Sequence, residues 1–184
     1  MFKIISFLFC IALACFTVLL LFAPLFELKS AAFTNTSLIP TQFTCDGDNV
    51  SPSLAWKRVP KGTKSYALIV TDPDVPDPNK PQGVWTHWVM YNISASIRQL
   101  PQRKRWALKS EHGVQGKNDW KVFGFSGPCP PVGKHRYFFT LYALDVEQLG
   151  VEQENANRLA VEKAMQGHIL KQTTLMGRYQ KSKL

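Results

Sequence analysis

The sequence predicts a mostly β fold with few helices. Strand signals dominate residues 33–145, where three runs rich in β-branched and aromatic residues are separated by proline-rich and polar segments. Helical patterns appear only after residue 145. The 184 residues suffice for one domain with a sizeable core, and no internal repeat or low-complexity segment marks a second domain.

The first 32 residues have the pattern of a targeting segment. Residues 4–26 carry no charged side chain, and Lys3 precedes them. Ser30 and Ala32 suit the −3 and −1 positions of a secretory cleavage site, which would start the mature chain at Phe33. The apolar run is also long enough to span a bilayer, so an uncleaved anchor contacting the membrane through residues 4–26 is the alternative. We therefore expect a signal peptide or anchor over 1–32, and an exported (periplasmic or secreted) domain over 33–184.

Two strands are predicted in the first half of the domain. Residues 65–71 form an aliphatic run that stops at an Asp-Pro turn. Residues 72–83 contain four prolines and three aspartates, so we expect no regular structure there. Residues 84–93 form the next strand. Alternation predicts that one face carries Trp85, His87, Val89 and Tyr91, and the other Thr86, Trp88 and Met90.

The second half of the domain begins with a long irregular crossing over residues 94–120, which are polar and basic with little periodicity. A strong strand follows at 137–145. Residues 154–165 place apolar side chains among helix formers and predict a helix. Residues 168–175 suit either a short final helix or an extended tail.

Two cysteines, Cys45 and Cys129, remain after the leader, and an even count in an exported domain favours a disulfide between them. Two free buried thiols are the alternative. Zinc binding is disfavoured because neither cysteine belongs to a CxxC or CxxH pair. The net charge of +9 is scattered and no aromatic residues interleave a basic stripe, so we expect no nucleic-acid partner.

Polar side chains gather at the ends of the strong strands. Asp72 and Asp74 follow the first strand, Trp85 and His87 open the second, and His135 and Tyr137 open the third. The third strand is preceded by a loop held by Gly127, Pro128 and Pro131. We expect these groups to share one preorganised pocket.

The chemistry of such a pocket suits a small anion. Imidazole N–H groups and a tyrosine hydroxyl donate hydrogen bonds, and an aspartate on the far ring nitrogen would orient a histidine. Catalysis is disfavoured because there is no complete G-x-S-x-G elbow, HExxH pair, Walker loop or GxGxxG. We therefore expect no enzyme activity, metal or cofactor. A hydrolase or metalloenzyme using the His/Asp cluster is the alternative.

The chain resembles the phosphatidylethanolamine-binding protein family, also called Raf kinase inhibitor-like proteins, and most of all its bacterial-type branch. Six short motifs in order over about residues 33–180 carry the resemblance: Asp46–Trp56, Asp72–Pro76, Trp85–Val89 with Asn92–Ile93, Gly127–Pro131 with His135–Tyr137, Gly167–Leu170 and Gly177–Tyr179.

The resemblance implies an antiparallel β-sandwich with small peripheral and C-terminal helices, and a pocket for phosphate or phosphorylated headgroups. Asp72, His87, the Gly127–Pro128 turn, His135 and Tyr137 would line it, Asp74 would support the turn, and Trp85 and Pro131 would be walls. The resemblance also implies a role as an inhibitor or modulator. Because this chain departs from eukaryotic members at 77–83 and near its C-terminus, kinase binding is not carried over, and no protein target follows.

Overall fold

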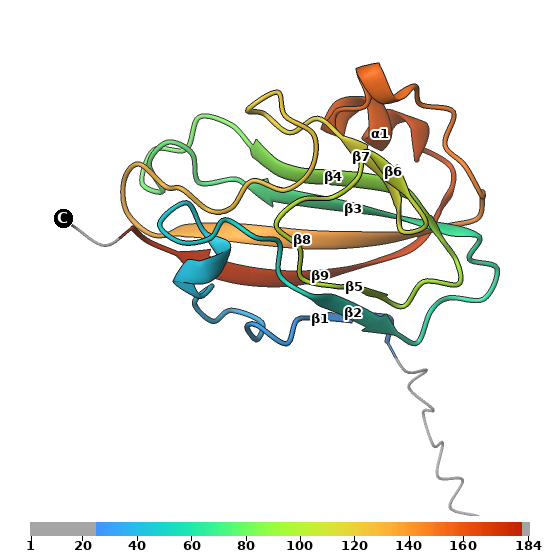
Figure 1. The fold of residues 1–184 in the computed structure, drawn as a ribbon, viewed down its shortest axis with the longest axis horizontal. Coiled ribbons are helices and arrows are strands. Elements are labelled where there is room, and N and C mark those ends of the chain that lie inside the picture. The colour runs from blue at the N-terminus through green and yellow to red at the C-terminus, as the bar shows by residue number, and fades with distance from the viewer. Residues whose placement is uncertain (1–24, 182–184) are drawn as a thin grey trace, which may run out of the picture.

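In the computed structural model, which describes residues 25–181, the chain forms two antiparallel sheets and one short helix (Figure 1). The large sheet contains, in spatial order, β6 (Lys109–Ser110), β7 (Gly113–Gly116), β4 (Trp85–Ser94), β3 (Ser65–Asp72), β8 (His135–Leu144) and β9 (Ile169–Tyr179). The small sheet contains β1 (Glu27–Lys29), β2 (Leu54–Lys57) and β5 (Gln99–Leu100). The helix α1 spans Arg158–Ala164, and two 3-10 turns span Thr41–Phe43 and Gln153–Asn155.

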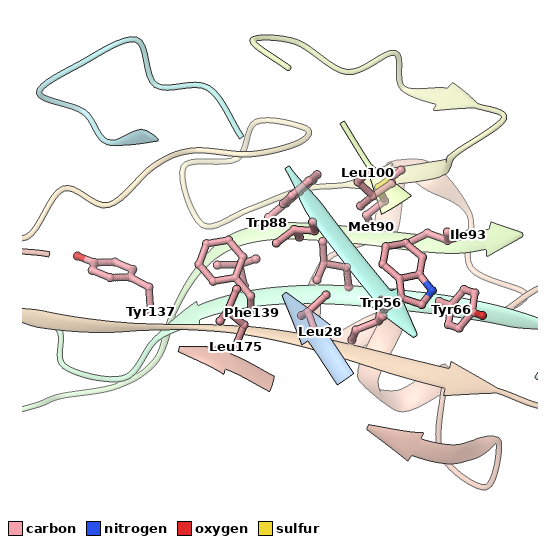
Figure 2. Close-up of a cluster of buried hydrophobic side chains, with 14 of the residues drawn as sticks. Leu28, Trp56, Tyr66, Trp88, Met90, Ile93, Leu100, Tyr137, Phe139 and Leu175 are labelled. Atoms are coloured by element: carbon pink, nitrogen blue, oxygen red, sulfur yellow. The ribbon is translucent and has the colours of Figure 1, made fainter. Parts of the chain in front are cut away.

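The main core fills the space between the two sheets. Leu28 and Trp56 reach into it from the small sheet, and Trp88 and Phe139 from the large one (Figure 2). A second cluster covers the other face of the large sheet, where Val161 of α1 packs over the strands. Packing on both faces explains why β3 is buried along nearly its whole length and reads as a continuous apolar run.

The mostly β fold is confirmed, and so are the three strong strands. The predicted helix is present but shorter, because Asn157 caps it by accepting a hydrogen bond from the Ala160 amide at 3.0 Å. Residues 169–179 form the strand β9, so of the two options for this segment the helix is wrong. The crossing over 94–120 contains the short strands β5, β6 and β7.

The fold begins before the predicted cleavage site. β1 pairs with β2, and Phe26 and Leu28 are each only 5% exposed. Phe26 and Leu28 are therefore packed in the domain, although the predicted boundary places them in the leader. Residues 1–24 lie outside the described part of the chain, and cleavage there stays a prediction. Between residues 25 and 181, none of the helices has the length and apolar character needed to cross a membrane.

Candidate functional site

A β-bulge at the start of β4 decides which side chains reach the candidate site. Val70 on β3 is opposite Trp88, but the next pair joins Thr71 to Thr86, so His87 is the extra residue. Bulges turn a side chain away from strict alternation. The His87 ring consequently lies 5.1 Å from the ring of Tyr137, whose side chain belongs to the main core on the Trp88 side. The alternation predicted for His87 is therefore wrong.

A cavity of about 480 Å³ opens beside this bulge. The loops that follow β3 and precede β8 contribute much of its wall, and both lie at the left-hand end of the large sheet in Figure 1. The lining residues are Asp72, Val75, Pro76, Gln82, Gly83, Val84, Trp85, His87, Trp120, Cys129 and Pro131. Four of the predicted site residues, Asp72, Trp85, His87 and Pro131, thus line one cavity.

His87 is neutral at physiological pH. Its side chain is 2% exposed, and burial lowers its pKa to about 4. Nδ1 lies 2.7 Å from the carbonyl oxygen of Ser126, so the neutral ring carries its proton there and donates it. Nε2 is then the ring nitrogen left for a ligand, and it is an acceptor. This differs from the sequence expectation that an imidazole N–H would donate to an anion.

His135 is buried behind the cavity and is already fully bonded. Its Nδ1 lies 2.7 Å from Oδ2 of Asp72, and its Nε2 lies 2.9 Å from the carbonyl oxygen of Val132. The other carboxylate oxygen of Asp72 accepts a hydrogen bond from the Asp74 amide at 2.8 Å. Asp72 therefore orients His135, as expected for an aspartate serving a histidine, but neither ring nitrogen of His135 is free for a ligand.

Asp74 supports the structure beside the cavity. Its carboxylate accepts hydrogen bonds from the backbone N–H, Nε and Nη2 of Arg136, at 2.9, 2.9 and 2.6 Å. These hydrogen bonds lower the pKa of Asp74. The pair joins the loop after β3 to the start of β8, so Asp74 shapes the site through Arg136 and does not face the ligand space.

Two buried donors near the cavity have no partner within residues 25–181. They are the indole N–H of Trp85, which lines the cavity, and the hydroxyl of Tyr137. Burial raises the pKa of Tyr137, and the charge and acceptor oxygens of the nearby Asp72 raise it further, so the phenol stays protonated although no acceptor among the described residues lies at hydrogen-bond distance. Buried polar groups without partners are uncommon, and each needs an explanation such as an absent ligand or water.

The Gly127–Pro128 turn holds the loop before β8 in place. The Gly127 amide donates to Oδ1 of Asn49 at 2.7 Å, and the Pro128 carbonyl accepts from the Cys45 amide at 3.0 Å. These backbone groups are therefore used inside the protein, although we expected them to face the ligand. Next to them, Cys45 and Cys129 form the predicted disulfide, with Cα atoms 5.4 Å apart. Because Cys129 lines the cavity, the disulfide ties its wall to the Cys45 segment.

Trp120 is a wall residue that the sequence analysis missed. Its ring lies 5.3 Å from that of Trp85 and 4.9 Å from that of His87. Buried Asn118 fixes the turn that carries it, because Oδ1 accepts from the Trp120 amide and Nδ2 donates to the Gly124 carbonyl. A tryptophan directly after Asn-Asp in the polar crossing was the available signal.

The described residues 25–181 contain no group of three or more His, Cys, Asp or Glu side chains placed to hold a metal ion. The histidine nearest to a carboxylate in the site is His135, and its two nitrogens are occupied as described above.

Comparison with known proteins finds a matching family model and relatives that are similar in sequence over most of the chain. The model of the phosphatidylethanolamine-binding protein family matches residues 29–180. A UPF0098 protein of Methanothermobacter thermautotrophicus is 46% identical over 156 residues, which are 84% of this chain and 99% of that protein. A UPF0098 protein of Chlamydia pneumoniae is 44% identical over 156 residues, covering 85% of this chain and 99% of that protein.

Two solved structures share the fold. A putative phosphatidylethanolamine-binding protein homologue of Chlamydia trachomatis has a TM-score of 0.76 and 40% identity, over 85% of this chain and 98% of its own. Escherichia coli YbcL has a TM-score of 0.76 and 31% identity, over 85% of this chain and 99% of its own. These two solved chains consist almost entirely of the matched domain, so such a domain folds by itself. The chain belongs to the phosphatidylethanolamine-binding protein family.

Proposed function

We propose that this protein is a binding protein whose cavity takes a small anion or phosphorylated headgroup. The observation that carries the proposal is a set of unpaired polar groups at one cavity. The buried indole N–H of Trp85 and Nε2 of His87 belong to residues that line it, and the buried hydroxyl belongs to Tyr137, which does not line it but contacts the His87 ring. Apolar walls from Trp120 and Pro131 complete the space. Concave, mostly apolar sites with a few convergent polar groups are typical of small-ligand sites.

The polarity of the three groups favours a protonated phosphoryl group. Trp85 and Tyr137 donate, which suits phosphoryl oxygens, whereas neutral His87 accepts and suits a P–OH. The second pKa of a phosphate monoester is about 6, so the monoanion that keeps this proton dominates below that pH. The Asp72 carboxylate lines the same cavity, and its hydrogen bonds with His135 and the Asp74 amide weaken its repulsion of a bound anion without removing it.

Calorimetric titration of inorganic phosphate and of phosphoethanolamine tests this proposal. We expect binding to strengthen as the pH falls from 8 to 6. Tyr137→Phe and Trp85→Phe each remove one donor and should weaken binding by about 1–3 kcal/mol, since each then leaves a ligand acceptor unpaired. Tighter binding of phosphoethanolamine than of phosphate would indicate a headgroup ligand, and equal binding would indicate recognition of the phosphoryl group alone.

Tyr142→Phe is the matched control, because Tyr142 lies on the same strand but packs with the second cluster on the other face of the sheet. Its affinity should equal that of the wild type. Equal affinity of all the variants, with intact folding, would contradict the proposal. The hydrolase or metalloenzyme alternative instead requires turnover of a phosphate ester or an effect of chelators, and the binding proposal expects neither.

We further propose that the domain works outside the cytoplasm, where it acts as a binding protein and, through its ligand site, as an inhibitor or modulator. The disulfide between Cys45 and Cys129 supports export, since such bonds persist in oxidising compartments. Fractionation of the native host checks it: the protein should be found outside the cytoplasmic fraction with both cysteines oxidised.

A further inference from the structure

The chain enters the described fold far from the cavity. The ring of Phe26 stacks 6.5 Å from the ring of Tyr66, near the start of β3, whereas Asp72 at the cavity is the last residue of that strand. Six residues of strand separate these positions, which corresponds to about 20 Å. Figure 2 shows the same separation, with Tyr137 at one end of the core and Tyr66 at the other.

No linker separates the apolar N-terminal run from the domain. Leu25 is 69% exposed, yet the next residue, Phe26, is 5% exposed and packed in the core. The uncharged run over residues 4–26 therefore continues directly into the fold. If a membrane holds this run, it lies directly against the end of the domain at which Leu25 emerges.

That end of the domain carries exposed apolar and basic side chains, which we call the N-terminal face: Leu25, Lys57, Arg58, Lys61, Leu170 and Lys171. Several contacts bring them together. Lys57 pairs across the strands with Glu27, and Arg58 lines the same groove as Leu25. The Lys61–Gly62 turn lies against the Leu170 side chain. Lys171 on β9 pairs with Ala143 on β8, and Ala143 pairs with Tyr66 on β3. The ring of Tyr66 stacks on that of Phe26, so Lys171 lies near the point where the chain enters the fold.

The charge of this face is strongly positive. Its nearest carboxylate, Glu27, is paired with Lys29, Lys57 and Arg58, so one negative charge is shared among three cations. Lys61 and Lys171 add two more positive charges. Two further carboxylates lie toward this end: Asp145 is 2.9 Å from the ring of His168, and exposed Glu147 lines a groove with Thr63 and Lys64. Exposed leucines among lysines and arginines match the chemistry of an anionic membrane surface.

We propose that the N-terminal face docks on an anionic membrane surface, so that the cavity opens away from that membrane into solution. This orientation is independent of what the cavity binds. It also excludes the cavity rim, where Val84, Trp120 and Val132 expose apolar side chains, from contact with the same membrane. A ligand would then reach the cavity from the aqueous side.

Vesicle partition of the domain tests the charge requirement. Residues 25–184 should co-sediment with phosphatidylcholine vesicles containing phosphatidylglycerol, and much less with phosphatidylcholine alone. Each lysine near an anionic surface strengthens attachment about fivefold (about 1 kcal/mol). The triple variant Lys57→Gln, Lys61→Gln, Lys171→Gln should therefore bind about a hundredfold more weakly. The control variant Lys80→Gln, Lys121→Gln, Lys134→Gln removes three exposed lysines of the segments around the cavity and should bind like the wild type.

Hydrogen exchange on the full chain reconstituted in the same vesicles tests the orientation. Backbone amides of residues 25–30, 57–62 and 169–173 should exchange more slowly in anionic than in zwitterionic vesicles, with no change at 82–87 or 129–134. Binding that does not depend on the anionic lipid would overturn the proposal. So would loss of binding in the cavity-side lysine variant, or protection of the cavity loops, because either result would show that the cavity rim docks instead.

Discussion

Single residues at the cavity owe their chemistry to the groups already bonded to them. His87 and His135 both lie at the ends of long strands, yet only His87 keeps a nitrogen for a ligand. The difference arises because Ser126 occupies one nitrogen of His87, whereas Asp72 and Val132 together occupy both nitrogens of His135. A histidine near a cavity is thus a ligand residue only when its partners leave it one free nitrogen.

The lowered pKa of His87 predicts an acid-sensitive fold. The pKa falls from 6.5 in an unfolded chain to about 4 in the fold, so the unfolded state binds the proton more readily between these values. The stability that neutral His87 contributes is complete above pH 6.5 and is lost as the pH falls through 4. This loss amounts to about 3 kcal/mol.

Urea unfolding at pH 7, 5 and 4 measures the effect. His87→Asn keeps an N–H for the Ser126 carbonyl but does not titrate, so its stability should fall less between pH 7 and 4 than that of the wild type. Parallel pH dependences for the two proteins would show that His87 is not the group responsible.

A second prediction concerns the stability of a variant at Tyr137. Its buried hydroxyl has no partner within the described residues, so in ligand-free protein Tyr137→Phe removes a polar group that is buried without compensation. We expect a melting temperature equal to or above that of the wild type, although the same variant binds phosphate more weakly. A clear loss of stability would mean that the hydroxyl has a structural partner.

At the scale of elements, the loop before β8 is held by contacts that allow no side chain at Gly127. A Cβ atom there would overlap the carbonyl oxygen of Phe43 and approach Thr44 Cα and Asn49 Oδ1 at 2.9 Å. Backbone atoms cannot rotate away as side chains do. The rigid loop therefore depends on glycine for close approach and not for an unusual backbone angle.

Gly127→Ala should consequently destabilise the fold by about 1–3 kcal/mol, as overpacked sites do. Gly150→Ala is the control, because nothing lies within 4 Å of a Cβ at that position. Thermal unfolding should show a lower melting temperature for the first variant and little change for the second. Equal melting temperatures would show that the segment Phe43–Asn49 moves aside.

The disulfide joins two elements that are 84 residues apart in sequence. In the chain-entropy model, closing a loop of that length stabilises the fold by about 4–5 kcal/mol. Cys45→Ser with Cys129→Ser should lower the free energy of unfolding by up to this amount, and non-reducing peptide mapping should recover the linked pair from the wild type. Full labelling of both thiols in native, oxidised protein would contradict the pairing.

At the scale of the whole molecule, the core needs both sheets. Phe26 and Leu28 pack from the small sheet onto the large one, and Phe33 contacts Phe139 with ring centroids 5.5 Å apart. A chain that starts at Phe33 would lack β1 and two buried side chains. Burial of such side chains stabilises by about 1.5–3 kcal/mol each.

A domain of residues 33–184 should therefore be about 3–6 kcal/mol less stable than one of residues 25–184, measured by denaturant unfolding. N-terminal sequencing of protein from the native host gives an independent check. A start at Phe33, with the stability of the longer domain, would show that β1 is dispensable.

Local sequence patterns were enough to predict the mostly β class, the three long strands, the cysteine pair and the polar groups at the strand ends. These depend on local patterns: runs of β-branched residues, proline turns, and the positions of the few cysteines and histidines. Membership of the family also followed from the order of short motifs. Asp72, Trp85, His87 and Pro131 could be placed at one cavity on this basis.

Which of these groups is free to bind depends on contacts that form only in the folded chain. The bulge at His87 depends on pairing between β3 and β4, and the partners of Gly127 and His135 come from segments distant in sequence. Trp120 reaches the cavity because Asn118 fixes its turn, and β9 is a strand because β8 offers an edge to pair with. Burial, pairing and hydrogen-bond satisfaction are properties of contacts across the fold, and local patterns do not carry them.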